Sequence, residues 1–123
     1  MSEETTILVI DDELEIGNYL KTLITQFGYR AEIATSGKDG LQTIQRIRPE
    51  LVILDVVMPD MDGLEVLKRI QEEKMDTSVI MLSGHRQTST VVGAMKLGAA
   101  DFLNKPFDPD ELQFIISKVL ERR

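Results

Sequence analysis

Leu51-Val52-Ile53-Leu54-Asp55 is the stretch that decides the fold, because four branched apolar residues in a row are closed by a carboxylate. A short apolar run without alternation is typical of a strand buried on both faces of a parallel sheet. The sequence contains four further runs of this kind, at residues 7–10, 31–34, 79–82 and 100–103. It therefore predicts five short parallel strands.

Segments with helical spacing separate these runs. Their apolar residues recur every three or four positions, as on the buried face of an amphipathic helix. The five stripes are Ile16, Leu20, Leu23, Ile24 and Phe27; Leu41, Ile44 and Ile47; Leu64, Leu67 and Ile70; Val91, Val92 and Met95; and Leu112, Ile115, Ile116 and Val119. Residues that cap or end helices lie between the stripes, namely Gly28, Ser36, Pro49, Gly98 and Asp108-Pro109.

Strand then helix, repeated five times, predicts an α/β fold in which helices cover both faces of an open parallel sheet. For five strands we expect the order 2-1-3-4-5, as in flavodoxin-like folds. Strands one and three are then neighbours, and ligands bind in the crevice at their carboxyl ends. Asp11-Asp12-Glu13 follows strand one and Asp55 ends strand three, so carboxylates meet in that crevice.

Composition narrows the classes of protein that remain. A chain of 123 residues suits one domain, which we expect to span residues 1–123. With 14 basic and 21 acidic residues the net charge is -7, which argues against direct nucleic acid binding. Cysteine is absent, so disulfides and thiolate metal sites are excluded. The sequence shows neither a secretory signal nor an apolar run long enough to span a membrane, so we expect a soluble, cytoplasmic protein.

The acidic crevice predicts a metal site. Carboxylates brought together repel one another unless a cation lies among them, and Mg²⁺ is held by one or two carboxylates together with phosphate oxygens. A structural alternative is that Asp11 or Asp12 only caps the helix that begins near Glu13. Asp55 favours a functional interpretation, because a charge at the end of a buried strand is unfavourable without partners.

The same residues suit phosphoryl chemistry. An aspartate carboxylate can act as a nucleophile toward phosphorus, and the charge that spreads over the phosphoryl oxygens needs a metal ion and a cation. Lys105 follows strand five at the same edge, and Ser83 ends strand four, where its hydroxyl can donate to a phosphoryl oxygen. Taken singly, Lys105 also fits a solvated surface residue and Ser83 a turn residue beside glycine.

Four motifs together resemble the receiver domain of two-component response regulators, in the superfamily of the chemotaxis regulator, over essentially the whole chain. They are Val9-Ile10-Asp11-Asp12-Glu13; Leu54-Asp55-Val56-Val57-Met58-Pro59-Asp60-Met61-Asp62-Gly63; Leu82-Ser83-Gly84; and Phe102-Leu103-Asn104-Lys105-Pro106-Phe107. The segment from Gly93 through Phe107 further resembles receivers of the nitrogen-regulation type, which are often joined to an ATPase and a DNA-binding domain.

The resemblance implies a role for each matching residue. It makes Asp55 the phosphoacceptor and Lys105 the cation that pairs with the phosphoryl group. It assigns Mg²⁺ to Asp12 and Asp55, to the backbone carbonyl of Val57, and to Asp11 through the second shell. Further implied roles are the switch pair Ser83 and Phe102, the tuning of phosphoryl lifetime by Val57 and His85, a glycine turn at Gly63, and a bond between Lys105 and Pro106 that is cis in the family.

The implied function is a phosphoacceptor switch and not a conventional enzyme. A sensor histidine kinase donates the phosphoryl group to Asp55, and its hydrolysis resets the switch. The face formed by the fourth helix, the fifth strand and the fifth helix then controls an output domain or a downstream protein. The chain is either free-standing or part of a longer regulator, and its fourth helix and charged tail permit a phosphorylation-dependent homodimer.

Three other classes of function share parts of this pattern: a cofactor- or nucleotide-binding domain, a phosphohydrolase and an interaction module. A flavodoxin-like cofactor carrier or a nucleotide-binding domain needs a glycine-rich loop after strand one, where this chain has acids. Aspartate-based phosphohydrolases usually carry a second aspartate two residues after the nucleophile, and here that residue is Val57. An interaction module independent of phosphate remains the third alternative.

Overall fold

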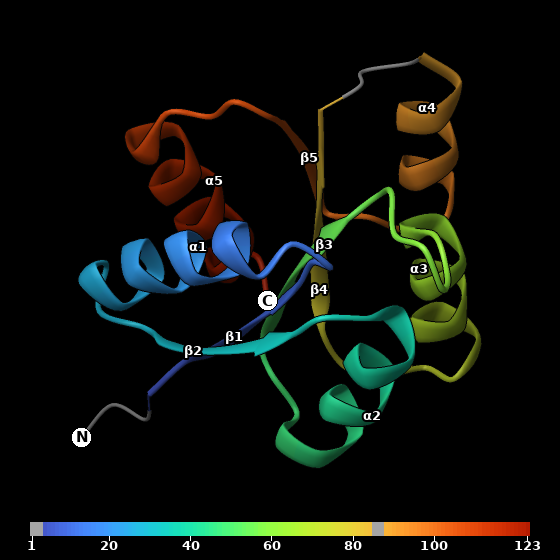
Figure 1. The fold of residues 1–123 in the computed structure, drawn as a ribbon, viewed down its shortest axis with the longest axis horizontal. Coiled ribbons are helices and arrows are strands. Elements are labelled where there is room, and N and C mark those ends of the chain that lie inside the picture. The colour runs from blue at the N-terminus through green and yellow to red at the C-terminus, as the bar shows by residue number, and fades with distance from the viewer. Residues whose placement is uncertain (1–3, 85–87) are drawn as a thin grey trace.

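The computed structural model describes residues 4–84 and 88–123, in which strands and helices alternate along the chain (Figure 1). The strands are β1 (Thr6–Ile10), β2 (Arg30–Ala34), β3 (Leu51–Asp55), β4 (Ser78–Ser83) and β5 (Asp101–Asn104). The helices are α1 (Leu14–Gln26), α2 (Gly37–Ile47), α3 (Gly63–Glu72), α4 (Thr88–Lys96) and α5 (Pro109–Glu121).

All neighbouring strands of the sheet are parallel, in the order β2-β1-β3-β4-β5, which confirms the predicted topology. Each strand lies within one residue of its predicted bounds. The central strands β1, β3 and β4 are almost completely buried, whereas the edge strands β2 and β5 are partly accessible. Burial on both faces explains why the central strands read as unbroken apolar runs.

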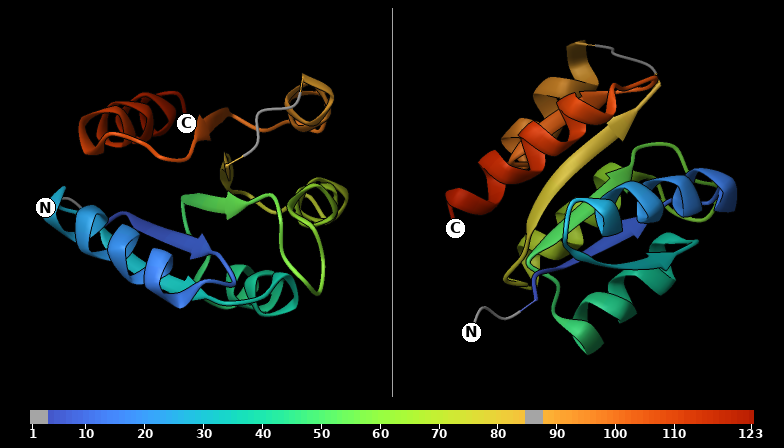
Figure 2. Two further views of the ribbon diagram at one scale, coloured as in Figure 1. Left: turned by 45° about the horizontal axis from the view of Figure 1, so that its top comes forward. Right: turned by 90° about the vertical axis from the view of Figure 1, so that its left-hand side faces the viewer.

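Two apolar cores cover the two faces of the sheet. Helices α1 and α5 pack on one face, through Leu20, Ile24, Leu112 and Ile116 among others. Helices α2, α3 and α4 pack on the other face (Figures 1 and 2). Successive residues of each strand point to opposite faces, so every central strand contributes to both cores.

The predicted caps lie where the sequence places them. Gly28 and Gly98 follow α1 and α4 with φ of 99° and 92°, in the left-handed region that glycine tolerates. Ser36 accepts a hydrogen bond from the N–H of Asp39 at 3.1 Å, and Asp108 accepts one from Asp110 at 2.8 Å. These bonds satisfy N–H groups that otherwise lack partners at a helix start.

The predicted buried stripe of α4 is wrong. Val92 and Met95 are 44% and 46% exposed, whereas Ala94 of this helix is fully buried. Val91 and Leu97, three residues to either side of Ala94, are half-buried. The small alanine therefore marks the face toward the sheet, and larger apolar side chains remain on the outside.

Within residues 4–84 and 88–123, no helix has the length and apolar character needed to cross a membrane.

Candidate functional site

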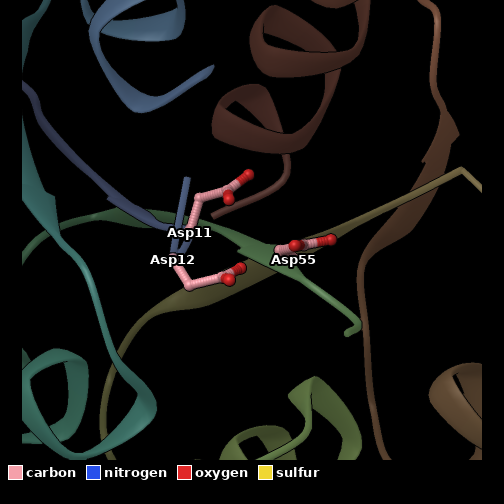
Figure 3. Close-up of side chains that lie close together, drawn as sticks. All are labelled: Asp11, Asp12 and Asp55. Carbon is pink, nitrogen blue, oxygen red and sulfur yellow. The ribbon is translucent and has the colours of Figure 1, made fainter. Parts of the chain in front are cut away.

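Three carboxylates meet at the carboxyl edge of the sheet. Asp55 is the last residue of β3, and Asp11 and Asp12 directly follow β1, whose residue Ile10 pairs with Leu54. Each of the three offers an oxygen within 4.8 Å of the others (Figure 3). Asp11 and Asp55 are 1% and 5% exposed, while Asp12 is accessible. The strand order thus brings together acids that lie more than forty positions apart, as the sequence predicts.

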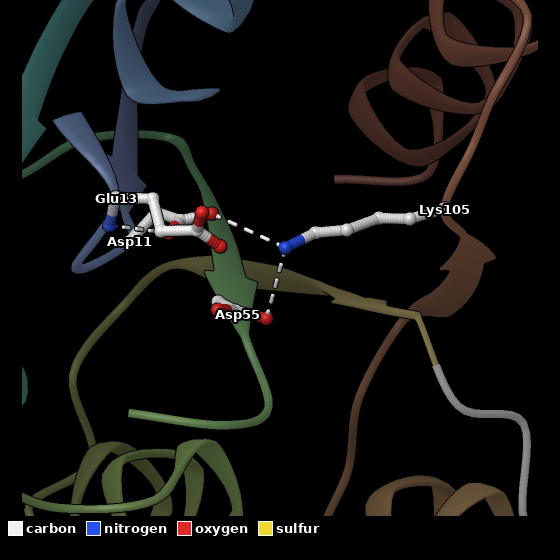
Figure 4. A network of polar contacts seen from close by, with 4 residues as sticks. All are labelled: Asp11, Glu13, Asp55 and Lys105. Carbon is white, nitrogen blue, oxygen red and sulfur yellow. Dashed lines mark hydrogen bonds and ion pairs between the residues drawn. The ribbon is translucent and has the colours of Figure 1, made fainter. Parts of the chain in front are cut away.

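Lys105 provides a cation between two of these acids. It follows β5, and its Nζ lies 3.4 Å from Asp55 Oδ1 and 3.5 Å from Asp11 Oδ2 (Figure 4). Its backbone N–H donates to the carbonyl of Ser83 at 2.8 Å, which fixes the start of the following loop against the end of β4. The ammonium group is therefore positioned where a phosphoryl group on Asp55 would need a positive partner.

Asp11 serves both the backbone and the cluster. Its Oδ1 accepts a hydrogen bond from the N–H of Glu13 at 2.9 Å, although the N-cap of α1 is Glu13 and not an aspartate. Its Oδ2 is buried and accepts no hydrogen bond from any residue that the structure describes; its contact with Lys105 is ionic. A buried carboxylate oxygen without a donor is unfavourable unless a cation approaches it. The capping alternative thus accounts for only one oxygen of Asp11, because the other faces the Lys105 ammonium within the acidic cluster.

Burial raises the pKa of Asp55 above its ordinary value of 3.8, and the charge of Asp11 raises this pKa further. Lys105 and a backbone hydrogen bond from Val57 oppose the rise in pKa. The carboxylate is therefore a charged group held in surroundings that disfavour its charge. A cation or a covalent partner that relieves the repulsion between Asp55 and Asp11 therefore stabilises the site.

The loop after β3 packs tightly on the acceptor strand. A Cβ at Gly63 would lie 2.4 Å from the carbonyl oxygen of Asp55 and 2.8 Å from Cα of Val56. The N–H of Gly63 donates to the carbonyl of Val56. Glycine is required here by close approach of two backbone segments rather than by a positive φ. Within this loop the side chain of Val57 is 65% exposed and points away from the core.

The remaining predicted residues surround this centre. Ser83 is 2% exposed at the end of β4, and Phe102 of β5 packs half-buried against the core under α4. The Lys105-Pro106 bond is cis, as the resemblance implies. His85 lies outside the described residues, so its predicted role stays a prediction.

The donor set fits a hard divalent cation. Asp11, Asp12 and Asp55 supply only carboxylate oxygens, which suit Mg²⁺ better than thiolate- or imidazole-seeking metals. Three carboxylates beside one ammonium group also leave negative charge at the site for a cation to balance. This cluster is able to hold a metal ion.

Comparison with known proteins agrees with this geometry. Residues 7–117 match the family model of the response regulator receiver domain. The chain belongs to this family. It is 34% identical to the regulatory protein AtoC of Escherichia coli over 121 residues, which cover 98% of this chain and 26% of AtoC. A CheY-like receiver domain protein from Methanospirillum hungatei has a TM-score of 0.93 and 28% identity, over 98% of this chain and 96% of that one.

The BeF3-activated receiver domain of DrrB also has this fold, with a TM-score of 0.87, 30% identity and coverage of 98% of this chain and 100% of that one. As a receiver domain, this chain is a phosphoacceptor switch of a two-component system and a signalling protein rather than a conventional enzyme. It spans 26% of AtoC and 50% of the transcriptional regulator ycf27 of Porphyridium aerugineum.

Asp60 is a further residue near the site, and the sequence alone predicts no role for it. In the structure its carboxylate accepts hydrogen bonds from the N–H groups of Gly37 and Lys38, at 3.1 and 3.2 Å. Both bonds lower the pKa of Asp60. An aspartate after a proline reads as a turn residue, and nothing in the sequence indicates a partner more than twenty positions away.

Proposed function

We propose that Asp55 accepts the phosphoryl group in this receiver domain, which occupies residues 1–123. The observation that carries the proposal is a buried carboxylate at the end of β3 with Asp11 and Asp12 within 4.8 Å and the Lys105 ammonium at 3.4 Å. The same arrangement provides a nucleophile, oxygen donors for a metal and a cation for the transferred group.

The donor is a phosphohistidine on a sensor histidine kinase. A carboxylate oxygen of Asp55 attacks phosphorus, forming an O–P bond, while the P–N bond breaks and its electron pair stays on the imidazole nitrogen. Lys105 neutralises charge that accumulates on the phosphoryl oxygens. Water later attacks the acyl phosphate, releases inorganic phosphate and restores the Asp55 carboxylate.

Mg²⁺ is the metal that this site would hold. Asp12, Asp55 and the backbone carbonyl of Val57 would ligate it, and Asp11 would act through the second shell. When bound, Mg²⁺ offsets the charge of the carboxylates and of the phosphoryl oxygens. The chain's own contribution is to hold these oxygens together before the donor arrives.

Ser83 and Phe102 form the switch. Ser83 turns toward the phosphoryl group on Asp55, and its hydroxyl donates to a phosphoryl oxygen. The Phe102 side chain changes its rotamer with this movement of Ser83, on the face made by α4, β5 and α5. That face controls an output domain or a downstream protein, or joins two phosphorylated copies, and the domain itself contacts no nucleic acid. We assign the switch to the cytoplasm, and Val57 and His85 to the tuning of phosphoryl lifetime. Similarity to receivers of the nitrogen-regulation type remains a prediction.

The central test is phosphoryl uptake from a small donor. With Mg²⁺ and acetyl phosphate, the wild-type chain gains the mass of one phosphoryl group, and Asp55→Asn gains none. Asp76→Asn is the matched control, because Asp76 lies at the opposite edge of the sheet and pairs with Arg123 at 3.2 Å; it gains mass like wild type. No gain with Asp55 intact would contradict the proposal and favour an interaction module independent of phosphate. Turnover of a phosphate ester that requires Asp55 would favour a phosphohydrolase.

A further inference from the structure

Asp60 links the loop that follows the acceptor strand to a helix on the flank of the sheet. The loop between β3 and α3 (residues 56–62, the β3–α3 loop) leaves the site at Asp55, and Asp60 lies near its far end. Its two carboxylate oxygens take separate partners: Oδ1 accepts from Gly37 and Oδ2 from Lys38. These are the first two residues of α2, so the contact joins segments 22 and 23 positions apart.

The start of α2 is capped from two directions. Ser36 accepts from the N–H of Asp39, while Asp60 takes the N–H groups of the two preceding residues. The first N–H groups of a helix have no partner within the helix and carry its positive dipole end, so a carboxylate there is favourable. One cap comes from the helix's own chain and the other from the β3–α3 loop.

Close packing supports the same junction. A Cβ at Gly37 would lie 2.9 Å from Cγ2 of Val66 and 3.0 Å from Cβ of Met61. Met61 is the loop residue after Asp60, and Val66 belongs to α3. Only glycine allows the start of α2 to approach the loop and α3 this closely, so the hydrogen bonds of Asp60 form at a tightly packed contact.

The near end of this loop contacts the acceptor. The Val57 backbone opposes the rise in the pKa of Asp55. A Cβ at Gly63, directly after the loop, would lie 2.4 Å from the carbonyl oxygen of Asp55. The N–H of Val56 donates to the carbonyl of Leu82 at 3.1 Å, which extends β3 by one residue beside β4. The β3–α3 loop is thus held at the acceptor by its first residues and at α2 by Asp60.

We propose that Asp60 is a positioning residue of the acceptor site, whose carboxylate ties the β3–α3 loop to α2 and so holds the loop in place beside Asp55. Its effect on phosphoryl uptake rests on the function proposed above. Its effect on the loop does not, because the hydrogen bonds of Asp60 to Gly37 and Lys38 involve neither a metal nor a phosphoryl group.

Two variants separate this role from simple capping of α2. Asp60→Ala removes the link between loop and helix, whereas Ser36→Ala removes a cap from the same helix without touching the loop. Amide hydrogen exchange of the metal-free proteins is the first measurement. We expect the amides of residues 56–62 to exchange about tenfold faster in Asp60→Ala, and at the wild-type rate in Ser36→Ala. Equal loop exchange in the two variants would overturn the inference.

The second measurement is the rate of phosphoryl uptake from acetyl phosphate. We expect Asp60→Ala to be slower by about tenfold and Ser36→Ala to match wild type, because a misplaced site lowers the fraction of productive geometries. Asp60→Asn keeps one acceptor oxygen and should recover part of the rate and of the protection. A wild-type rate in Asp60→Ala would also overturn the positioning role. If the wild-type chain itself took up no phosphoryl group, the proposed function would fail while the exchange result still decided the role of Asp60 in the loop.

Discussion

At the edge where the strands begin, charged side chains have partners, whereas at the edge where the strands end three carboxylates cluster and one ammonium group contacts two of them. Glu50 accepts a hydrogen bond from the N–H of Thr6 at 2.8 Å, and Arg123 donates to Ser78 and pairs with Asp76. At the opposite edge Asp11, Asp12 and Asp55 lie together, Lys105 pairs with Asp11 and Asp55, and one oxygen of Asp11 accepts no hydrogen bond from a described residue. The contacts at the first edge stabilise the fold, whereas the second edge carries negative charge that a bound cation can balance.

The largest test of this contrast removes the cation from the acidic edge. We expect Lys105→Ala to slow phosphoryl uptake from acetyl phosphate by about 100-fold, because one preorganised charge on the transferred group is lost. The rate is followed by the mass gain of the protein at fixed Mg²⁺ concentration. Arg123→Ala, at the other edge, is the control and should keep the wild-type rate. Equal rates in the two variants would remove Lys105 from the site.

The lifetime of the phosphoryl group on Asp55 provides the next test. Val57 is exposed beside Asp55 and its apolar side chain cannot orient an attacking water. We therefore expect Val57→Asn to quicken loss of the phosphoryl group by about tenfold, through a side chain that can hydrogen bond that water. Inorganic phosphate released from the purified phosphoprotein measures this rate. An unchanged rate in Val57→Asn would refute the hypothesis that Val57 slows dephosphorylation.

The smallest effects concern stability, and here the two edges should differ in sign. In the unfolded chain Asp55 has its ordinary pKa of 3.8, and in the folded chain burial and Asp11 raise that pKa. Between these two values the folded state binds more protons, so the free energy of unfolding falls as pH rises through that window. At pH 7 and without metal, Asp55→Asn should therefore raise the free energy of unfolding. This gain should vanish below pH 3.8.

Glu50→Ala is the counterpart at the opposite edge. It leaves the N–H of Thr6 without its acceptor, so we expect the free energy of unfolding to fall by about 1 kcal/mol. Urea denaturation measures both variants. Mg²⁺ should stabilise wild type and Glu50→Ala, and should stabilise Asp55→Asn less, because that variant lacks one ligand. A loss of stability in Asp55→Asn would contradict the inference that the charge of Asp55 destabilises the folded state.

Much of this site can be predicted from the sequence, because the topology of a parallel sheet determines where its residues lie. Parallel strands present their carboxyl ends at one edge, so the positions of Asp11, Asp55 and Lys105 follow once the five apolar runs are recognised. The buried face of α4 does not follow from hydrophobicity alone. Hydrophobicity predicts that Val92 and Met95 are buried, whereas the small Ala94 packs in the core and those two side chains are exposed. The contact of Asp60 with α2 cannot be predicted from the sequence, because it depends on how closely Gly37 approaches Met61 and Val66 in the folded chain.

In a mutational library, Gly63 and Asp55 would look alike when signalling output is scored and opposite when protein abundance is scored. Any side chain at Gly63 collides with the backbone of Asp55, so substitutions there should lower both the abundance of the protein and its signalling output. Asp55 carries an unfavourable charge, so its neutral substitutions should abolish output while leaving abundance equal or higher. Scoring one library by both readouts would therefore sort residues that build the switch from residues that operate it.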